Sequence, residues 1–274
     1  SSLNRENLAA FYAAISESPV IAKSFRPTIL EMASRMKNVQ FLTRVVNELL
    51  KQLESSPASV ASMRSLTSIL TVMDRQGNEL PQQTMARIDK ALAQALITAN
   101  DEEMTVSVRI AAIELSGRTA KHTETLLELL SSTEPIEIQT ATTKVLAPTN
   151  PQEILKRFTG MSPGVRSAAV ESLLSRESTA RDLMSAISTK AIPINSISLL
   201  HQQRLTSHVD KQLQAEAKKL FDSSQTSDER TQLISKYQSS ISPNGDIPRG
   251  KQIFTQHCGT CHHFKGIGNK VGPD

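Results

Sequence analysis

Apolar side chains recur at helical spacing along most of the chain. One stripe consists of Leu42, Val45, Val46, Leu49, Leu50 and Leu53, and a second consists of Met85, Ile88, Leu92, Leu96 and Ile97. Such spacing predicts amphipathic helices that bury one face. A turn is expected at Gly77-Asn78, and Pro81 stands where the second helix would begin. No segment alternates with a period of two for long, so the pattern predicts no β-strand.

A short motif also recurs through the middle of the chain. Its four copies are Val108–Ile113, Ile138–Thr143, Val165–Val170 and Ile194–Leu199, and they begin 30, 27 and 29 residues apart. That spacing is typical of a repeated pair of helices. We therefore expect each copy to begin the second helix of a pair. The expected first helices are Thr123–Leu130, Pro151–Phe158 and Thr179–Ile187.

Small residues inside the motif suggest close packing between helices. They are Ala111, Ala112, Ala141, Ala168 and Ala169, which would let consecutive pairs stack, and the pattern resembles HEAT repeats. An ordinary helical bundle is the alternative, and the regular spacing favours repeats. Residues 1–100 fit the register less well, and we expect them to continue the stack as irregular or capping repeats.

The helical pattern ends near residue 240. A last helix is expected over Asp228–Ser240, and Pro, Gly and Asn then crowd into residues 241–248, as in a linker. The sequence thus predicts a helical-repeat domain over residues 1–240, a linker over 241–248, and a distinct C-terminal segment over 249–274.

Composition and charge narrow the classes of function. The aromatic content is 3% without Trp, and Gly and Pro number 10 and 12 among 274 residues, which suits stacked helices. The net charge is +4, but basic and acidic residues are interleaved, so we expect no nucleic-acid partner. There is no apolar run long enough to span a membrane, and the first residues do not form a signal peptide. We expect isolated surface histidines at His122, His201 and His208, and no catalytic residues.

The two cysteines of the chain, Cys258 and Cys261, are three positions apart. One pair at this spacing excludes a disulfide framework. One helical turn would place both sulfurs on the same side, where each could form a thioether with a vinyl group of haem. His262 follows directly and could bind the iron as an axial ligand. The segment Cys258–His262 therefore predicts covalent attachment of haem c.

Two other kinds of site use similar residues. A thioredoxin-like dithiol would place its cysteines at a helix start in a βαβ unit, and no sheet is expected here. A zinc site could use both cysteines and two of the histidines, His257, His262 and His263. Structural zinc sites usually add a second ligand pair from a distant part of the sequence, so haem attachment is favoured.

The residues on both sides of Cys258–His262 also follow a recognisable pattern. Residues 249–258 are expected to form a short amphipathic helix with Ile253 and Phe254 as its apolar face. Gly266 and Gly268 are expected to lie in a loop that can pass close to the flat haem ring. The runs 250–254, 258–262 and 268–274 resemble the opening of a class I cytochrome c domain. They are also similar to the haem-binding domain of large exported proteins of planctomycetes and verrucomicrobia. In that family a helical-repeat region precedes the cytochrome, often after a β-propeller resembling sugar or quinone-dependent dehydrogenases.

The resemblance implies an all-α fold: a HEAT-like helical-repeat solenoid followed by the start of a cytochrome c domain. It implies thioethers at Cys258 and Cys261, iron ligation by His262, packing of Phe254 near the haem, and a carbonyl at Pro273 that accepts the hydrogen of the imidazole Nδ1. For Phe254 and Pro273, ordinary packing and turn formation are the alternatives.

The family's distal ligand, usually Met, lies several tens of residues beyond the attachment motif. Here all eight Met residues precede Cys258 and the sequence ends twelve residues after His262, so we expect a chain broken off within its cytochrome domain. A C-terminal segment of about 26 residues is too short to enclose a haem alone, and haem binding by this segment in isolation is left open.

The resulting functional hypothesis is electron transfer through haem c, with the solenoid as scaffold, in an exported or periplasmic bacterial protein. The expected partner is a redox protein or an upstream dehydrogenase domain. Two alternatives stay open: a protein-interaction scaffold, and the electron-accepting part of a larger exported dehydrogenase. Lys251, Lys265 and Lys270 could steer an acidic redox partner or simply be solvated.

Overall fold

The computed structural model describes residues 7–16, 28–225, 235–238, 245–260 and 262–269. Contacts divide the chain into two units, residues 1–217 and 218–274, and each is described by itself. Most of the predicted helix Asp228–Ser240 and half of the predicted linker 241–248 lie outside the described residues, as do Cys261, Lys270 and Pro273. Residues 235–238 are helical.

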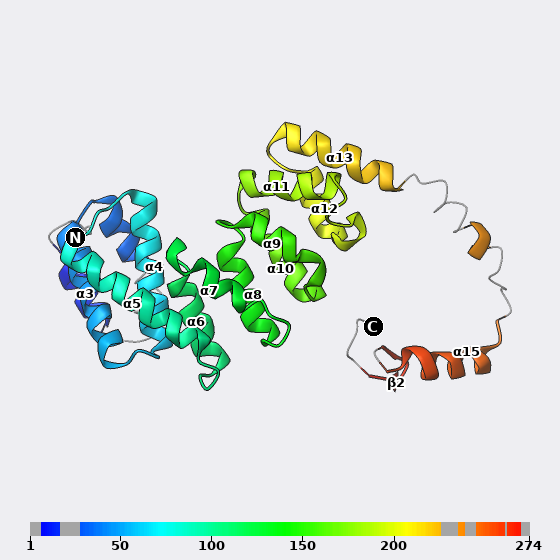
Figure 1. Ribbon diagram of the computed structural model, residues 1–274, viewed down its shortest axis with the longest axis horizontal. Coiled ribbons are helices and arrows are strands. Elements are labelled where there is room, and N and C mark those ends of the chain that lie inside the picture. The colour runs from blue at the N-terminus through cyan, green and yellow to red at the C-terminus, as the bar shows by residue number, and fades with distance from the viewer. Residues whose placement is uncertain (1–6, 17–27, 226–234, 239–244, 261, 270–274) are drawn as a thin grey trace. The chain divides into compact units, whose positions relative to one another are not determined.

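The described residues are predominantly helical (Figure 1), which confirms the all-α class. Among them no helix is both long and apolar enough to cross a membrane. The helices of the first unit include α1 (Leu8–Ser16), one over residues 28–35, α3 (Val39–Ser55), α4 (Val60–Gln76), α5 (Gln82–Asn100), α6 (Val106–Ser116), α7 (Thr123–Glu128), α8 (Ile136–Leu146), α9 (Pro151–Arg157), α10 (Pro163–Leu173), α11 (Glu177–Ser188) and α12 (Leu199–Thr206). Helix α13 (Lys211–Gln225) follows. Short 3₁₀ turns occur at Ala120–His122, Phe158–Gly160 and Ile194–Ser196.

The first predicted stripe is confirmed in α3. Its six apolar residues from Leu42 to Leu53 are all buried. The helix begins after Asn38, whose side chain accepts a hydrogen bond from the backbone N–H of Phe41, as expected of an N-cap residue. The next helix, α4, ends at Gly77, which has a left-handed φ of 58°. A glycine adopts this conformation at little cost, so it terminates the helix where the sequence predicts a turn.

The second predicted stripe is only partly correct. Helix α5 begins directly after Pro81 and buries Ile88 and Leu92. Met85 and Ile97, however, are 45% and 65% exposed. The buried face instead includes Thr84, Ala95, Thr98 and Ala99. Helix α5 packs extensively against α6 and also contacts α3. Small side chains therefore make up much of the buried face, and two of the larger apolar residues lie on the exposed side.

Three of the four motif copies lie in alternate helices. They begin at the third residue of α6, α8 and α10, and α6 packs on α8, which in turn packs on α10. The expected first helices are confirmed as α7, α9 and α11. Four of the five small residues of the motif, Ala111, Ala112, Ala141 and Ala169, are buried, and Ala168 is half-buried.

The prediction for the fourth copy, Ile194–Leu199, was wrong. Residues Ile194–Ser196 form a 3₁₀ turn, Ile197 is extended, and α12 begins only at Leu199. The reason lies in Ser198, whose hydroxyl accepts the backbone N–H of His201 and caps the helix. A strong N-cap fixes the start of a helix more firmly than an apolar spacing does.

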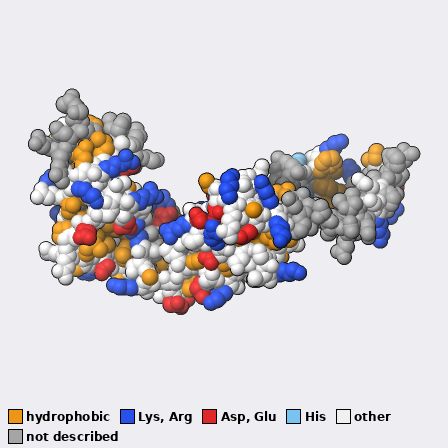
Figure 2. Space-filling view, turned by 90° about the horizontal axis from the view of Figure 1, so that it is seen from above, with side chains coloured by type: hydrophobic (Ala, Val, Ile, Leu, Met, Phe, Trp, Pro, Cys, Tyr) orange, Lys and Arg blue, Asp and Glu red, His pale blue; other side chains and the backbone are white. Residues whose placement is uncertain are grey.

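Charged side chains of both signs are interspersed over the visible face of the first unit (Figure 2). Several pairs link neighbouring helices, including Arg64 with Glu114 at 3.6 Å and Arg87 with Glu54 at 2.9 Å. One pair is nearly buried: Arg109 and Glu134 are 5% and 12% exposed, and their charged groups lie 2.8 Å apart. Arg109 also donates to the carbonyl of Ala99 at 2.9 Å, so it joins the end of α5 to the residues before α8.

The second unit contains α15 (Ile247–Ile253), the π-helical turn Phe254–Cys258, and two short antiparallel strands, β1 (His263–Phe264) and β2 (Ile267–Gly268). The expectation of no β-strand was therefore wrong. Each strand has two residues, too few for a period of two to appear. The hairpin is formed by its turn, in which Lys265 and Gly266 have φ values of 45° and 83°; positive φ at both central positions is typical of a tight hairpin.

Candidate haem-attachment site

The C-terminal segment begins with a capped helix. Asp246 accepts a hydrogen bond from the backbone N–H of Arg249 at 3.0 Å, and Pro248 lies in the first turn of α15, where its missing N–H is tolerated. The predicted helix over 249–258 is present in modified form. After Ile253 the α-helix passes into the π-helical turn, which is closed by a 2.7 Å hydrogen bond from Gly259 N–H to the carbonyl of Phe254.

A backbone hydrogen bond joins the two described ends of the cysteine motif. The backbone N–H of His262 donates to the carbonyl of Cys258 at 2.8 Å. The side chains of Cys258 and His262 are exposed, so the thiol and the imidazole are accessible to a large planar group. Cys261 lies outside the described residues, and its predicted role stays a prediction.

Phe254 is half-buried and packs against Phe264. Their rings meet edge to face at a centroid distance of 6.0 Å, an arrangement favoured between aromatic rings. The ammonium of Lys265 lies 5.5 Å from the centre of the Phe264 ring. The hairpin thus supplies an aromatic neighbour for Phe254, close in sequence to the cysteine motif. Packing of Phe254 against haem stays a prediction, as does the role of Pro273, which lies outside the described residues.

The end of the hairpin contacts the backbone of the cysteine motif. Asn269 donates its backbone N–H to the carbonyl of Gly259 at 2.9 Å and its side-chain amide to the carbonyl of Thr260 at 3.3 Å. Gly268 has a φ of 91°, and a Cβ there would lie 2.1 Å from the carbonyl oxygen of His262. The sequence indicates Gly268 as a loop glycine but gives no sign of the contacts of Asn269, since these depend on the reversal of chain direction by the hairpin.

The described residues fit a covalently attached haem. Cys258 and His262 are exposed and are joined by a backbone hydrogen bond, and Gly268 lets its strand approach the backbone of this segment without a side chain. Among the described residues there is no group of three or more side chains placed to hold a metal ion. Because Cys261 is not among them, the zinc alternative stays untested.

No family model matches this chain, and searches of curated proteins and of solved structures returned no match.

The three isolated histidines of the first unit differ from one another. His122 and His208 are half-buried, and His122 Nδ1 lies 2.9 Å from the carbonyl oxygen of Ser116. His201 is only 5% exposed, so the prediction of a surface histidine was wrong there. It is buried because it lies between the hydroxyl of Ser198, 3.0 Å from Nδ1, and the carboxylate of Glu171, 3.4 Å from Nε2.

The Ser198, His201 and Glu171 side chains form a structural contact between α12 and α10. The Ser198 hydroxyl already accepts the backbone N–H of His201 as a helix cap. Arg204 donates to Glu171. This hydrogen bond and the nearby charge of Arg204 lower the pKa of Glu171, and partial burial opposes them. Each polar group therefore has a stabilising role that accounts for its position.

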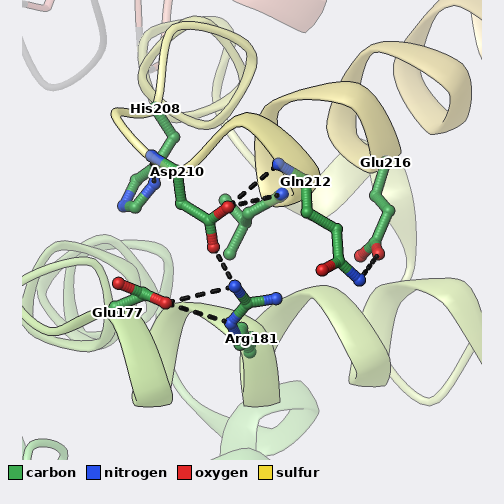
Figure 3. Close-up of polar contacts among 7 residues, drawn as sticks. Glu177, Arg181, His208, Asp210, Gln212 and Glu216 are labelled. Atoms are coloured by element: carbon green, nitrogen blue, oxygen red, sulfur yellow. Dashed lines mark hydrogen bonds and ion pairs between the residues drawn. The ribbon is translucent and has the colours of Figure 1, made fainter.

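A similar cluster joins α11 to α13 (Figure 3). Arg181 donates to Glu177 at 3.1 Å and also to Asp210, and the hydrogen bond to Glu177 raises the pKa of Arg181. Asp210 accepts the backbone N–H groups of Gln212 and Leu213 at 2.9 and 3.4 Å. Partial burial acts to raise the pKa of Asp210, but these two N–H groups and Arg181 together lower it. Asp210 therefore caps α13 as an ionised carboxylate.

The first unit also has a pocket between α3, α4 and α5. Its volume is about 210 Å³, with Leu50, Met63 and Ala95 among its lining residues. Small-molecule sites usually enclose roughly 300–1,000 Å³, so this pocket is small for a ligand. The guanidinium of Arg87 in its wall is already bound to Glu54 and to Asn47. The exposed cysteine motif is therefore a stronger candidate site than this pocket.

Proposed function

We propose that the intact protein transfers single electrons through a haem c attached to Cys258 and Cys261, with His262 as an iron ligand. The observation that carries this proposal is the run Cys258–His262, in which two thiols and one imidazole fall within five residues. Support comes from the exposed Cys258 and His262 side chains on a single hydrogen-bonded turn. When bound, the haem supplies the one-electron chemistry, and the protein positions it and sets its surroundings.

In this proposal, each cysteine is attached to haem by the addition of its thiol to a vinyl group. At Cys258 and at Cys261, the sulfur forms a bond to one carbon of a haem vinyl group, and the thiol hydrogen is added to the other carbon. No atom leaves, and no external oxidant or reductant is consumed in either addition. His262 donates a nitrogen lone pair to iron, for which its imidazole must be neutral. Phe254 would shield the site on the hairpin side together with Phe264.

The helical unit would serve as a scaffold in this proposal. Three successive motif helices, α6, α8 and α10, pack one on the next, as a HEAT-like solenoid requires. Such a scaffold would hold the haem near a redox partner protein or an upstream dehydrogenase domain. Haem c is attached outside the cytoplasm, so we also propose that the protein is exported, in bacteria to the periplasm.

The test is to export the intact protein into a bacterial periplasm that has the haem-attachment machinery. We expect a pyridine haemochrome spectrum and a mass increase of one haem. Cys258→Ala and Cys261→Ala should each lose one thioether, and the double variant should be colourless. His257→Ala is the matched control, since this exposed neighbour lies outside the motif and should keep full haem content. A colourless protein with two unmodified thiols, or with bound zinc, would refute the proposal.

A further inference from the structure

A second and larger pocket of the first unit lies between α1, α3 and α4. Its volume is about 410 Å³, and small-molecule sites usually enclose roughly 300–1,000 Å³. Most of its wall comes from α3. The side chains that this helix contributes therefore decide which kind of ligand the pocket can take.

Helix α3 lines the pocket with two parallel rows of side chains. The apolar row consists of Phe41, Val45 and Leu49, and the polar row consists of Arg44, Glu48 and Gln52. Successive members of each row are four residues apart, so they lie one above the other on the same face of the helix. A ligand in the pocket therefore meets apolar side chains along one row and charged or amide groups along the other.

The apolar part of the wall is completed by Tyr12 of α1. Its ring meets the ring of Phe41 edge to face, with 5.4 Å between the centroids and 81° between the planes, an arrangement favoured between aromatic rings. The three residues of the apolar row are buried in the helical unit. This part of the wall is thus packed in place, and it favours a ligand that has an apolar body of its own.

The two charged residues of the polar row have no side-chain partner among the described residues. Arg44 and Glu48 are both exposed, and neither takes part in an ion pair or a side-chain hydrogen bond there. In the smaller pocket, by contrast, Arg87 is bound to Glu54 and to Asn47. The pair also stands in the less favourable order for a helix, with the cation four residues before the anion. One guanidinium and one carboxylate are therefore free to bind a ligand.

The spacing of these two charges matches a short zwitterion. Residues four apart in a helix have Cβ atoms about 5–6 Å apart, and two residues of extended chain span at most about 7 Å. A guanidinium binds a carboxylate, and a carboxylate binds an ammonium group. The two ends of a dipeptide can therefore reach Arg44 and Glu48 at the same time.

Gln52 adds a hydrogen-bond donor to the polar row. Its amide oxygen accepts the hydroxyl of Ser62 at 3.1 Å, and the Ser62 oxygen in turn accepts the hydroxyl of Ser59 at 3.0 Å. This series of hydrogen bonds orients the amide, and its NH₂ group has no acceptor among the described residues. A carbonyl oxygen of the ligand is the matching acceptor, and a peptide bond supplies one.

We propose that this pocket binds a short zwitterionic peptide with apolar side chains, in its simplest form a dipeptide. The carboxylate of the peptide pairs with Arg44 and its ammonium group with Glu48. Its carbonyl accepts a hydrogen bond from Gln52, and its side chains lie against the apolar row. The site belongs to the first unit and does not depend on the proposed haem attachment.

The first test compares three probes by NMR titration of the full chain. Leucyl-leucine carries both charges, N-acetyl-leucyl-leucine lacks the ammonium group, and leucyl-leucine amide lacks the carboxylate. Leucyl-leucine should bind most tightly, and each blocked probe about two- to fivefold more weakly, as expected for charge pairs at exposed positions. If the acetylated probe binds as tightly as leucyl-leucine, the pocket takes an apolar carboxylate and the zwitterion is wrong. If no probe binds, the site is wrong.

The second test assigns each charge to its residue. In Arg44→Gln, leucyl-leucine should bind about two- to fivefold more weakly than to the parent protein, whereas leucyl-leucine amide should bind no more weakly. In Glu48→Gln, leucyl-leucine should again lose affinity and N-acetyl-leucyl-leucine should not. Arg75→Gln and Glu79→Gln are the matched controls, since both residues are exposed and neither lines this pocket. Charge variants that weaken all three probes equally would overturn the assignment.

A third variant tests the location of the site. Ala61→Phe places a ring at an exposed position of the pocket wall, where it fills part of the space without disturbing the core. It should weaken all three probes to a similar extent and leave the helical content, measured by circular dichroism, unchanged. Undiminished binding of leucyl-leucine to Ala61→Phe would mean that the peptide binds elsewhere, and it would overturn the proposal.

Discussion

The helical unit and the cysteine-containing segment are stabilised in different ways. The helical unit buries whole apolar side chains, such as Phe158, Leu66 and Ile113, each with no exposed surface. Among described residues 245–269, by contrast, only Gly259 is buried, and Ile247 and Phe264 are 82% and 59% exposed. Backbone hydrogen bonds, a helix cap and one aromatic pair shape this second region. A segment whose backbone is hydrogen-bonded in this way therefore does not require a core of buried side chains. Its exposed apolar residues are compatible with the proposed binding of a large apolar group.

The largest expected effect is on the core of the helical unit. Phe158→Ala should lower the free energy of unfolding by about 3–5 kcal/mol, since it removes a completely buried ring and leaves a cavity. The measurement is urea denaturation followed by circular dichroism. Phe254→Ala is the matched control, because the same truncation at a half-buried ring of the second unit should leave the main transition almost unchanged. Comparable losses in the two variants would contradict the contrast between the regions.

The nearly buried ion pair should have the next largest effect. Arg109→Met leaves the carboxylate of Glu134, 12% exposed, without its partner, and an uncompensated buried charge destabilises a protein by about 3–5 kcal/mol. We expect a loss at the lower end of this range in urea denaturation. The double variant Arg109→Met, Glu134→Leu should recover more than half of it, because no charge is then left buried. A double variant as unstable as the single one would show that lost packing, and not the unpaired charge, causes the effect.

A smaller effect is expected at Gly117, which follows α6. A Cβ at this position would lie 2.0 Å from Cγ1 of Val145 and 3.1 Å from the carbonyl of Ile113. Overpacking of this kind usually destabilises a protein by about 1–3 kcal/mol. Gly117→Ala should therefore lower the melting temperature, and Val145→Ala in the same chain should restore part of it by removing the clashing methyl group. If Val145→Ala gives no recovery, the nearby carbonyl of Ile113 must limit the space.

The sequence predicts a helix of this protein well where the apolar spacing alone decides which face is buried and where the helix begins. The stripe in α3 faces the core as expected, since its spacing and its buried side agree. In α5 the apolar spacing indicates the wrong side at Met85 and Ile97, because the buried face includes Thr84, Ala95, Thr98 and Ala99, whose small side chains give little hydrophobic signal. At Ser198, a cap displaces the predicted helix start.

The candidate site can likewise be predicted only in part from the sequence. The prediction of haem attachment depends on the spacing of Cys258, Cys261 and His262 in the sequence, and it stays a prediction. The contacts that shape the turn are not predictable in this way. Gly268 and Asn269 make these contacts with backbone carbonyls. Every residue has a backbone carbonyl, so the residue types in the sequence do not indicate which carbonyls accept these hydrogen bonds.

The smallest expected effect concerns acid stability and the contact between α10 and α12. The pKa of Glu171 is lowered from its ordinary 4.5, chiefly by the hydrogen bond from Arg204. A carboxylate with a lowered pKa stabilises the folded state above its unfolded pKa, and this contribution is lost as the pH falls through the folded pKa. Because the side chain is 54% exposed, screening limits the contribution at neutral pH to about 0.2–1 kcal/mol.

Urea denaturation as a function of pH measures this contribution. The parent protein should exceed Glu171→Gln in stability at pH 7, and the difference should shrink once the pH is below the lowered pKa, where both chains carry a neutral side chain at position 171. Glu79→Gln is the control, since Glu79 is exposed and lies between α4 and α5, away from this contact, and its substitution should change stability little at any pH. A difference between parent and Glu171→Gln that stays constant down to low pH would mean that position 171 acts through packing and not through its charge.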